Sequence, residues 1–181
     1  MRTVALILTG LLTTLTAPAA NVPRPSPELA MERYNDKPIK LSQYRGKTVA
    51  LAFTYTTCEH CQYLTRTLKV IQKDYAARNV QVLECAFNED AALTMPMVYK
   101  TLEPTFPIGI AKEAEVKKYL LWNDTTDGIL YVPYMIFIDA AGTIRGDYSG
   151  KDGFFNNPEE RIRAVLDKMV KPAAKPVAKK K

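Results

Sequence analysis

Cys58-Glu59-His60-Cys61 lies between an apolar run and a strongly amphipathic stretch of the chain. Two cysteines at this spacing, at the start of a predicted helix, can form and break a disulfide without movement of the backbone. The N-terminal end of a helix also favours negative charge, and the thiolate is the form of cysteine that attacks disulfides. The motif therefore predicts thiol–disulfide chemistry.

Residues 58–78 are predicted to be helical, because apolar side chains recur along one face. The members of this stripe are Cys61, Leu64, Leu68, Ile71 and Tyr75. Cys58 lies at the tip of the helix, where Thr56 and Thr57 are candidate N-caps. We therefore expect Cys58 to be the exposed nucleophile and Cys61 the sheltered thiol that resolves the mixed disulfide.

The elements around the motif predict an α/β fold. Residues 48–54 are nearly all apolar, as is typical of a central parallel strand buried on both faces, and a second strand at 80–87 follows at the spacing of a βαβ unit. The later predicted elements are a helix at 89–102 kinked or broken at Pro96, a short strand within 105–111, a helix at 113–122, a polar loop at 123–128, and a hairpin of 134–138 and 143–148. A last helix is predicted from its start signals, which are Asn157 as N-cap, Pro158 at the first helical position and Glu160 placed for a capping box. This order predicts a central mixed β-sheet flanked by helices on both faces.

The two ends of the chain differ in composition from its middle. Residues 1–19 fit a secretory signal peptide, and the alternative is an uncleaved membrane anchor. Residues 20–34 are predicted to be a proline-rich linker, and residues 35–170 the folded domain. Residues 171–181 form a Lys/Pro/Ala tail, which is either solvated or attached weakly to an anionic envelope surface.

The formal net charge of +6 belongs mostly to these ends. Six of the 25 basic residues lie in the leader or the tail, so the remaining 19 balance the 19 acidic residues. A nucleic-acid-binding surface on the domain is therefore not predicted. The three cysteines are too few for a disulfide-dense scaffold.

The chain resembles the thioredoxin-like superfamily, and within it the exported TlpA/ResA-like proteins of the redoxin (AhpC/TSA-related) group. The resemblance covers residues 35–170 and rests on residues 41–47, the strand before the cysteine motif, the motif itself and residues 132–142. It implies a thioredoxin-like fold with an insert of helix and strand before the strand that follows a cis-proline. It also implies that Val132 and Pro133 form a substrate-binding edge beside Cys58.

The resemblance further implies protein thiols and disulfides as substrates, an upstream electron donor as partner, no cofactor, and a periplasmic or otherwise extracytoplasmic location. In relatives, a buried acid helps to deprotonate the resolving thiol. Here the strand at 48–54 has no carboxylate, and Leu64 occupies the position three residues after Cys61 where relatives place an acid. The family's aromatic residue just before the first cysteine is also absent. Glu59 and water remain the candidates for the base.

His60 and Cys85 each allow two interpretations. A positive imidazole at His60 would stabilise the Cys58 thiolate while Glu59 acts in the opposite sense, or His60 is a solvated side chain without catalytic effect. Cys85 alternates with Leu83 and Phe87 on one face of a strand. It is therefore expected to pack in the core, with a third redox thiol as the alternative.

These features predict a thiol–disulfide oxidoreductase that acts on protein disulfides in the cell envelope through Cys58 and Cys61, with His60 assisting. The resemblance favours a reductant or isomerase-type partner over a dedicated oxidase. Two alternatives stay open. One is a copper-binding metallochaperone domain, because residues 55–58 resemble those of Sco-type copper chaperones, although the chain's single histidine lies inside the motif. The other is a non-catalytic interaction domain with a structural disulfide. No metal site is predicted.

Overall fold

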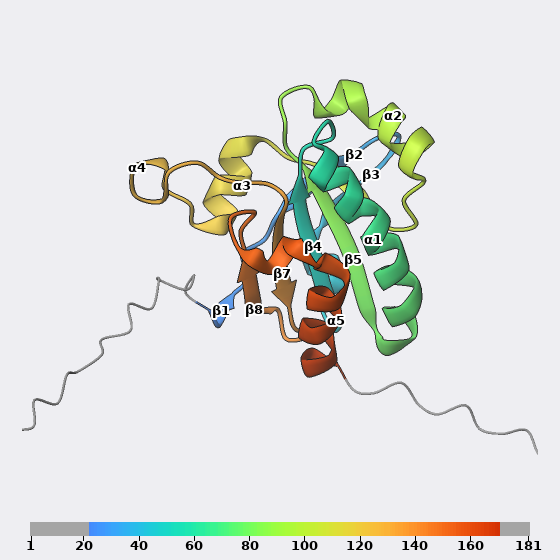
Figure 1. Cartoon of the computed structure of the whole chain (residues 1–181), viewed down its shortest axis with the longest axis vertical. Helices are drawn as coiled ribbons and strands as arrows, with labels where there is room; N and C mark the ends of the chain where they lie inside the picture. Colours follow the sequence, from blue (N-terminus) through green and yellow to red (C-terminus); the bar gives the residue numbers. More distant parts are fainter. Residues whose placement is uncertain (1–21, 171–181) are drawn as a thin grey trace, which may run out of the picture.

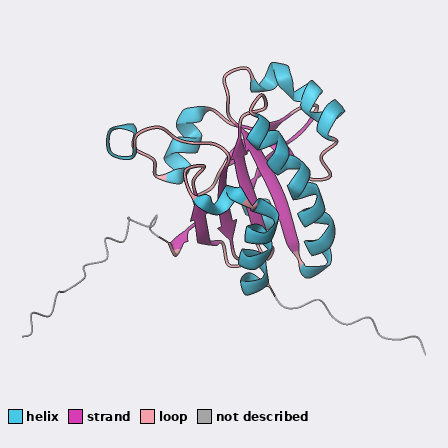
Figure 2. Cartoon of the chain, in the orientation of Figure 1, coloured by secondary structure: helices cyan, strands magenta, loops and turns pink. Residues whose placement is uncertain are grey.

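A mixed β-sheet forms the centre of the molecule in the computed structural model, which describes residues 22–170 (Figure 2). Its strands, in spatial order, are β1 (Arg24–Pro25), β8 (Thr143–Tyr148), β7 (Tyr134–Ile138), β4 (Thr48–Thr54), β5 (Val80–Ala86), β6 (Ile108–Ile110), β2 (Ala30–Arg33) and β3 (Asp36–Lys40). β4, β5 and β6 run parallel, whereas the remaining pairs are antiparallel. The predicted mixed sheet is confirmed.

Helices cover both faces of this sheet (Figure 1). The α-helices are α1 (Glu59–Tyr75), α2 (Ala91–Leu102), α3 (Glu113–Leu120), α4 (Asp124–Asp127) and α5 (Pro158–Met169), and the short 3₁₀ helices are η1 (Leu41–Tyr44), η2 (Ala76–Arg78) and η3 (Gly153–Asn156). The apolar stripe of α1 packs with α2 and α5 on one face, and α3 packs on the other. Every residue of β4 is buried, as the all-apolar pattern predicts for a strand covered on both sides.

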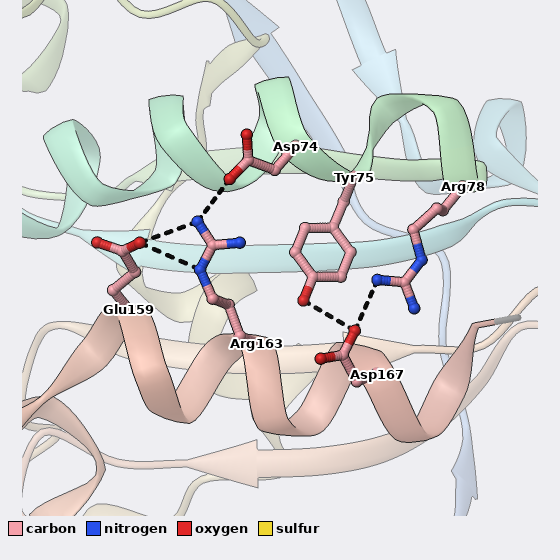
Figure 3. Close-up of polar contacts among 6 residues, drawn as sticks. All are labelled: Asp74, Tyr75, Arg78, Glu159, Arg163 and Asp167. Atoms are coloured by element: carbon pink, nitrogen blue, oxygen red, sulfur yellow. Dashed lines mark hydrogen bonds and ion pairs between the residues drawn. The ribbon is translucent and has the colours of Figure 1, made fainter. Parts of the chain in front are cut away.

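Polar side chains at the C-terminal end of α1 and in η2 contact α5 (Figure 3). Arg163 of α5 donates hydrogen bonds to Asp74, at 2.6 Å, and to Glu159, at 2.9 Å. Asp167 accepts from the Tyr75 hydroxyl, at 2.9 Å, and from the Arg78 guanidinium, at 2.6 Å. These contacts hold the helix that begins at the cysteine motif against the last helix of the chain.

The structure differs from the predictions in several places. The stretch 20–34, predicted to be a linker, contains β1 and β2, so the sheet begins before residue 35. Prolines are tolerated there because β1 lies at an edge of the sheet, where a missing N–H costs no ladder bond. Of the two predicted effects of Pro96, a kink or a break, the break does not occur, because α2 continues through it. The predicted loop at 123–128 contains the single turn α4.

The last helix begins at Pro158, as predicted. In place of the predicted capping box, the side chains of Asn157 and Glu160 bond to each other. The predicted signal peptide at residues 1–19 and the tail at 171–181 lie outside the described residues. No helix within residues 22–170 has the length and hydrophobicity that a bilayer span requires.

Candidate active site

Cys58 is the N-cap of α1, and its sulfur accepts a hydrogen bond from the backbone N–H of Cys61, at 3.4 Å. The sulfur therefore lies at the N-terminal end of a 17-residue helix, where N–H groups and the helix dipole favour an anion. Cys58 is partly exposed, whereas Cys61 is 1% exposed. The predicted difference in exposure between the two cysteines is confirmed.

Cys61 is sheltered by the core beneath the helix. Burial raises the pKa of the Cys61 thiol well above its ordinary value, and the contact with Cys58 raises it further. Two thiols three residues apart thus differ in access to solvent, and the inner one holds its proton strongly. A reaction in which Cys61 acts as a nucleophile needs a group that takes this proton.

The predicted N-caps, Thr56 and Thr57, do not cap the helix, because Cys58 itself does. Thr56 is turned toward the loop that follows β5: its N–H donates to the side-chain oxygen of Asn88, at 2.9 Å, and its hydroxyl bonds to Thr94 of α2, at 2.7 Å. Gln62 also donates to the Thr56 carbonyl, at 2.9 Å. These bonds fix the segment before Cys58. The sequence offered no spacing rule that would have identified Asn88 in this role.

Val132 and Pro133 are joined by a cis peptide bond, as the resemblance implies. The antiparallel register pairs Phe53 with Tyr134, so Pro133 lies at the end of β4 from which the chain continues to Cys58. His60, Tyr63, Val132 and Pro133 are among the residues that line a cavity of about 190 Å³. The structure thus brings three of the predicted site residues, His60, Val132 and Pro133, to one groove beside the start of α1.

Gly150 closes one side of this groove. Its backbone lies so near the cis-proline loop that a Cβ atom there would be 3.1 Å from the Pro133 carbonyl oxygen and from the backbone carbons of Tyr131 and Val132. Its N–H donates to the Tyr131 carbonyl, at 3.4 Å. Glycine is therefore the residue that allows this close approach.

A buried carboxylate, Glu84 of β5, lies on the α1 face of the sheet and is 4% exposed. It accepts hydrogen bonds from the hydroxyl of Thr54 in β4, at 2.8 Å, and from the hydroxyl of Thr65 in α1, at 3.0 and 3.1 Å. The Thr65 hydroxyl also contacts the backbone carbonyl of Cys61, at 3.0 Å. Burial raises the pKa of Glu84 to about 7, against the smaller lowering effect of the two hydroxyls.

Glu84 was missed in the sequence, although a signal was present. It is an acid in the middle of an apolar strand, on the face opposite to Leu83 and Cys85. Cys85 packs fully buried in the core on that other face, as predicted, and burial raises the pKa of its thiol. Within the described range 22–170, no group of three or more histidine, cysteine or acidic side chains is arranged as around a metal ion.

The fold, a cysteine pair at a helix start and a cis-proline before the neighbouring strand define a protein of the thioredoxin-fold class. The chain belongs to the AhpC/TSA family, whose family model matches residues 22–146. It is 23% identical, over 144 residues, to the thiol-disulfide oxidoreductase ResA of Bacillus thuringiensis subsp. konkukian, a match covering 80% of this chain and 76% of ResA.

Solved structures show the same fold. A thiol:disulfide interchange protein DsbE from Chlorobium tepidum superposes with a TM-score of 0.64 at 19% identity, covering 80% of this chain and 96% of its own. The thioredoxin domain of a thiol-disulfide oxidoreductase from Bacteroides vulgatus gives a TM-score of 0.65 at 13% identity, covering 86% of this chain and 100% of its own. The predicted family and thioredoxin-like fold are therefore confirmed.

Proposed function

We propose that this protein is a thiol–disulfide oxidoreductase that exchanges disulfides with protein substrates through Cys58 and Cys61. The observation that carries the proposal is the asymmetry of the pair: one sulfur is partly exposed at the start of α1, and the other is buried one turn further along. The names of the relatives, thiol-disulfide oxidoreductase and thiol:disulfide interchange protein, support the same reaction.

In the reducing direction, the Cys58 thiolate attacks one sulfur of a substrate disulfide. A bond forms between Cys58 and that sulfur, and the other substrate sulfur leaves as a thiolate. Cys61 then loses its proton and attacks the Cys58 sulfur, which closes the Cys58–Cys61 disulfide and releases the second substrate thiolate. Two electrons pass from the protein to the substrate, and an upstream dithiol donor restores the reduced pair.

The groove beside Pro133 is the proposed substrate-binding edge. Val132 offers backbone groups to an extended segment of the substrate, and His60 lines the same groove. Tyr63, in this groove, and Tyr131, next to Val132, are largely exposed, at 56% and 41%. Exposed aromatic side chains at such a rim suit contact with a polypeptide better than contact with a small thiol.

Export to an extracytoplasmic compartment remains part of the proposal and rests on the leader-like sequence at residues 1–19. The lysine-rich tail is proposed to contribute at most weak contact with an envelope surface. No feature of residues 22–170 favours the copper-binding alternative or an inert disulfide over exchange.

The proposal is tested by trapping. Cys61→Ser removes the resolving thiol, so substrate proteins should accumulate as mixed disulfides on Cys58 in cells that express the full chain. Cys58→Ser, which removes the nucleophile and leaves the buried thiol, is the matched control and should trap none. Equal trapping by both variants, or none by either, would contradict the proposed function.

A further inference from the structure

We propose that Glu84 accepts the proton of Cys61 when Cys61 attacks the mixed disulfide, a role that rests on the proposed function. The Sγ–H bond of Cys61 breaks, its proton passes to the Glu84 carboxylate, and the Cys58–Cys61 bond forms as the substrate thiolate leaves. In the oxidising direction, the protonated Glu84 returns the proton to the Cys61 sulfur.

The position of Glu84 supports this role. Thr65, one turn beyond Cys61 on α1, donates its hydroxyl to Glu84 and also to the Cys61 carbonyl, so the carboxylate lies under the segment of the helix between Cys61 and Thr65. Burial is the main cause that raises the pKa of Cys61, and the negative charge of Glu84 adds a smaller contribution. Glu59, by contrast, is exposed to solvent on the outside of that turn.

Nothing in the described part of the chain neutralises Glu84. Its side chain bonds to two hydroxyls, from Thr54 and Thr65, and forms no ion pair among residues 22–170. Its register partners, Ala52 in β4 and Ile108 in β6, do not titrate. The charge of Glu84 raises the pKa of two thiols, those of Cys61 in α1 and of its neighbour Cys85, and Cys85 packs on the other face of the sheet. A buried carboxylate without a cation is costly, and such groups are concentrated at functional sites.

A purely structural role makes a different prediction. If Glu84 only joined β4, β5 and α1 through hydrogen bonds, Glu84→Gln would be harmless, because the amide oxygen accepts from the same two hydroxyls. If Glu84 acted only through its charge, removing the charge would make Cys61 easier to ionise and its attack faster. Only a proton acceptor predicts a slower attack.

The test is a stopped-flow reaction of the reduced full chain with the aromatic disulfide dithionitrobenzoate. Attack by Cys58 releases a first nitrothiobenzoate, and attack by Cys61 on the resulting mixed disulfide releases a second. Cys61→Ser identifies the second phase, because this variant keeps the first release by Cys58, and any second release that persists in it comes from Cys85. Glu84→Gln should leave the first phase unchanged and slow the second by about a hundredfold near neutral pH.

The pH profile gives a readout that a structural role would not change. In the wild type, the second phase should rise with pH through an inflection near 7, where Glu84 titrates, and Glu84→Gln should abolish that inflection. Glu115→Gln, which removes an exposed carboxylate from α3 on the other face of the sheet, is the matched control and should match the wild type.

An equal or faster second phase in Glu84→Gln would overturn the proposal and leave the proposed function standing. A slow second phase in Glu59→Gln with a normal one in Glu84→Gln would assign the role to Glu59 instead. A wild type that forms the mixed disulfide but never releases the second product would contradict the proposed function itself. If Glu84→Gln fails to fold, a carbon NMR titration of the Glu84 carboxyl in the wild type replaces it. The proposal requires the midpoint of that titration to coincide with the inflection in the rate of the second phase, and a different midpoint would overturn it.

Discussion

Glu84 of β5 lies directly across from Ala52 of β4 in the parallel register of the two central strands. The strand that leads to Cys58 therefore has a small side chain at this position, and the carboxylate reaches the α1 face from the neighbouring strand. Residues 48–54 contain no carboxylate, and the structure places one beside them from β5, at a position that sequence spacing does not predict.

The buried carboxylate should make stability depend on pH. Glu84 has a pKa of about 7 in the folded protein, raised from 4.5, so between these values the folded state holds a proton that the unfolded state has lost. The free energy of unfolding should therefore fall as pH rises from about 4.5 to 8, by roughly 3 kcal/mol relative to Glu84→Gln. Urea titrations of both proteins at several pH values measure this difference. A constant difference across the range would contradict the raised pKa.

The cysteines should differ sharply in reactivity in the folded, reduced protein. Cys58 is partly exposed, whereas Cys61 and Cys85 are buried and the pKa of each of their thiols is raised. Brief treatment with iodoacetamide at neutral pH should modify Cys58. The rates of modification of Cys61 and Cys85 should be at least about tenfold lower. Peptide mass spectrometry gives the three rates. Comparable rates at Cys58 and Cys61 would contradict the proposed division of roles.

Gly150 should be sensitive to a single added methyl group. Gly150→Ala places a Cβ against the backbone of the cis-proline loop, so the proposed substrate-binding edge must shift. We expect the rate of disulfide exchange with a protein substrate to fall by up to about tenfold. The circular dichroism spectrum of Gly150→Ala should remain that of the native protein. Gly153→Ala is the control, because its Cβ would meet only the Asn156 side chain, at 3.6 Å. Equal activity of the two variants would argue against binding at this edge.

The polar contacts that α5 makes with the end of α1 and with η2 should contribute little to the free energy of unfolding. Asp167 is about half exposed, so Asp167→Asn, which removes the ion pair with Arg78, should lower the free energy of unfolding by less than about 1 kcal/mol at neutral pH (Figure 3). The Arg78 guanidinium lowers the pKa of Asp167, so this stabilisation is lost as pH falls through the folded-state value. Thermal melts at neutral and acidic pH test both points. A loss well above 1 kcal/mol would show that these contacts are not screened by solvent.

The sequence predicted the parts of the site that depend on local pattern. The stripe that includes Cys61 predicted its burial, the apolar run at 48–54 predicted a central strand, and the proline at 133 was placed at the cis bond through the family resemblance. Each of these features is determined by residues within a few positions of one another or by a recognisable motif.

The missed features depend on residues that are distant in the chain. Glu84 reaches Thr54 of β4 and Thr65 of α1 through the pairing of β4 with β5, and Gly150 lies near Pro133 only because the loop after β8 folds back. β1 was missed for another reason: prolines favour extended backbone both in a linker and at a sheet edge. The predicted linker also included β2, which contains no proline. Only the partner strands, β8 and β6, distinguish these two cases.

The most direct test of the central claim is the identity of the cysteine that first bonds to substrate. Purified Cys61→Ser protein, incubated with a peptide that contains a disulfide, should form one mixed disulfide, which peptide mapping places at Cys58. A mixed disulfide at Cys85, or no mixed disulfide under conditions in which the peptide reacts with a free thiol, would contradict the account.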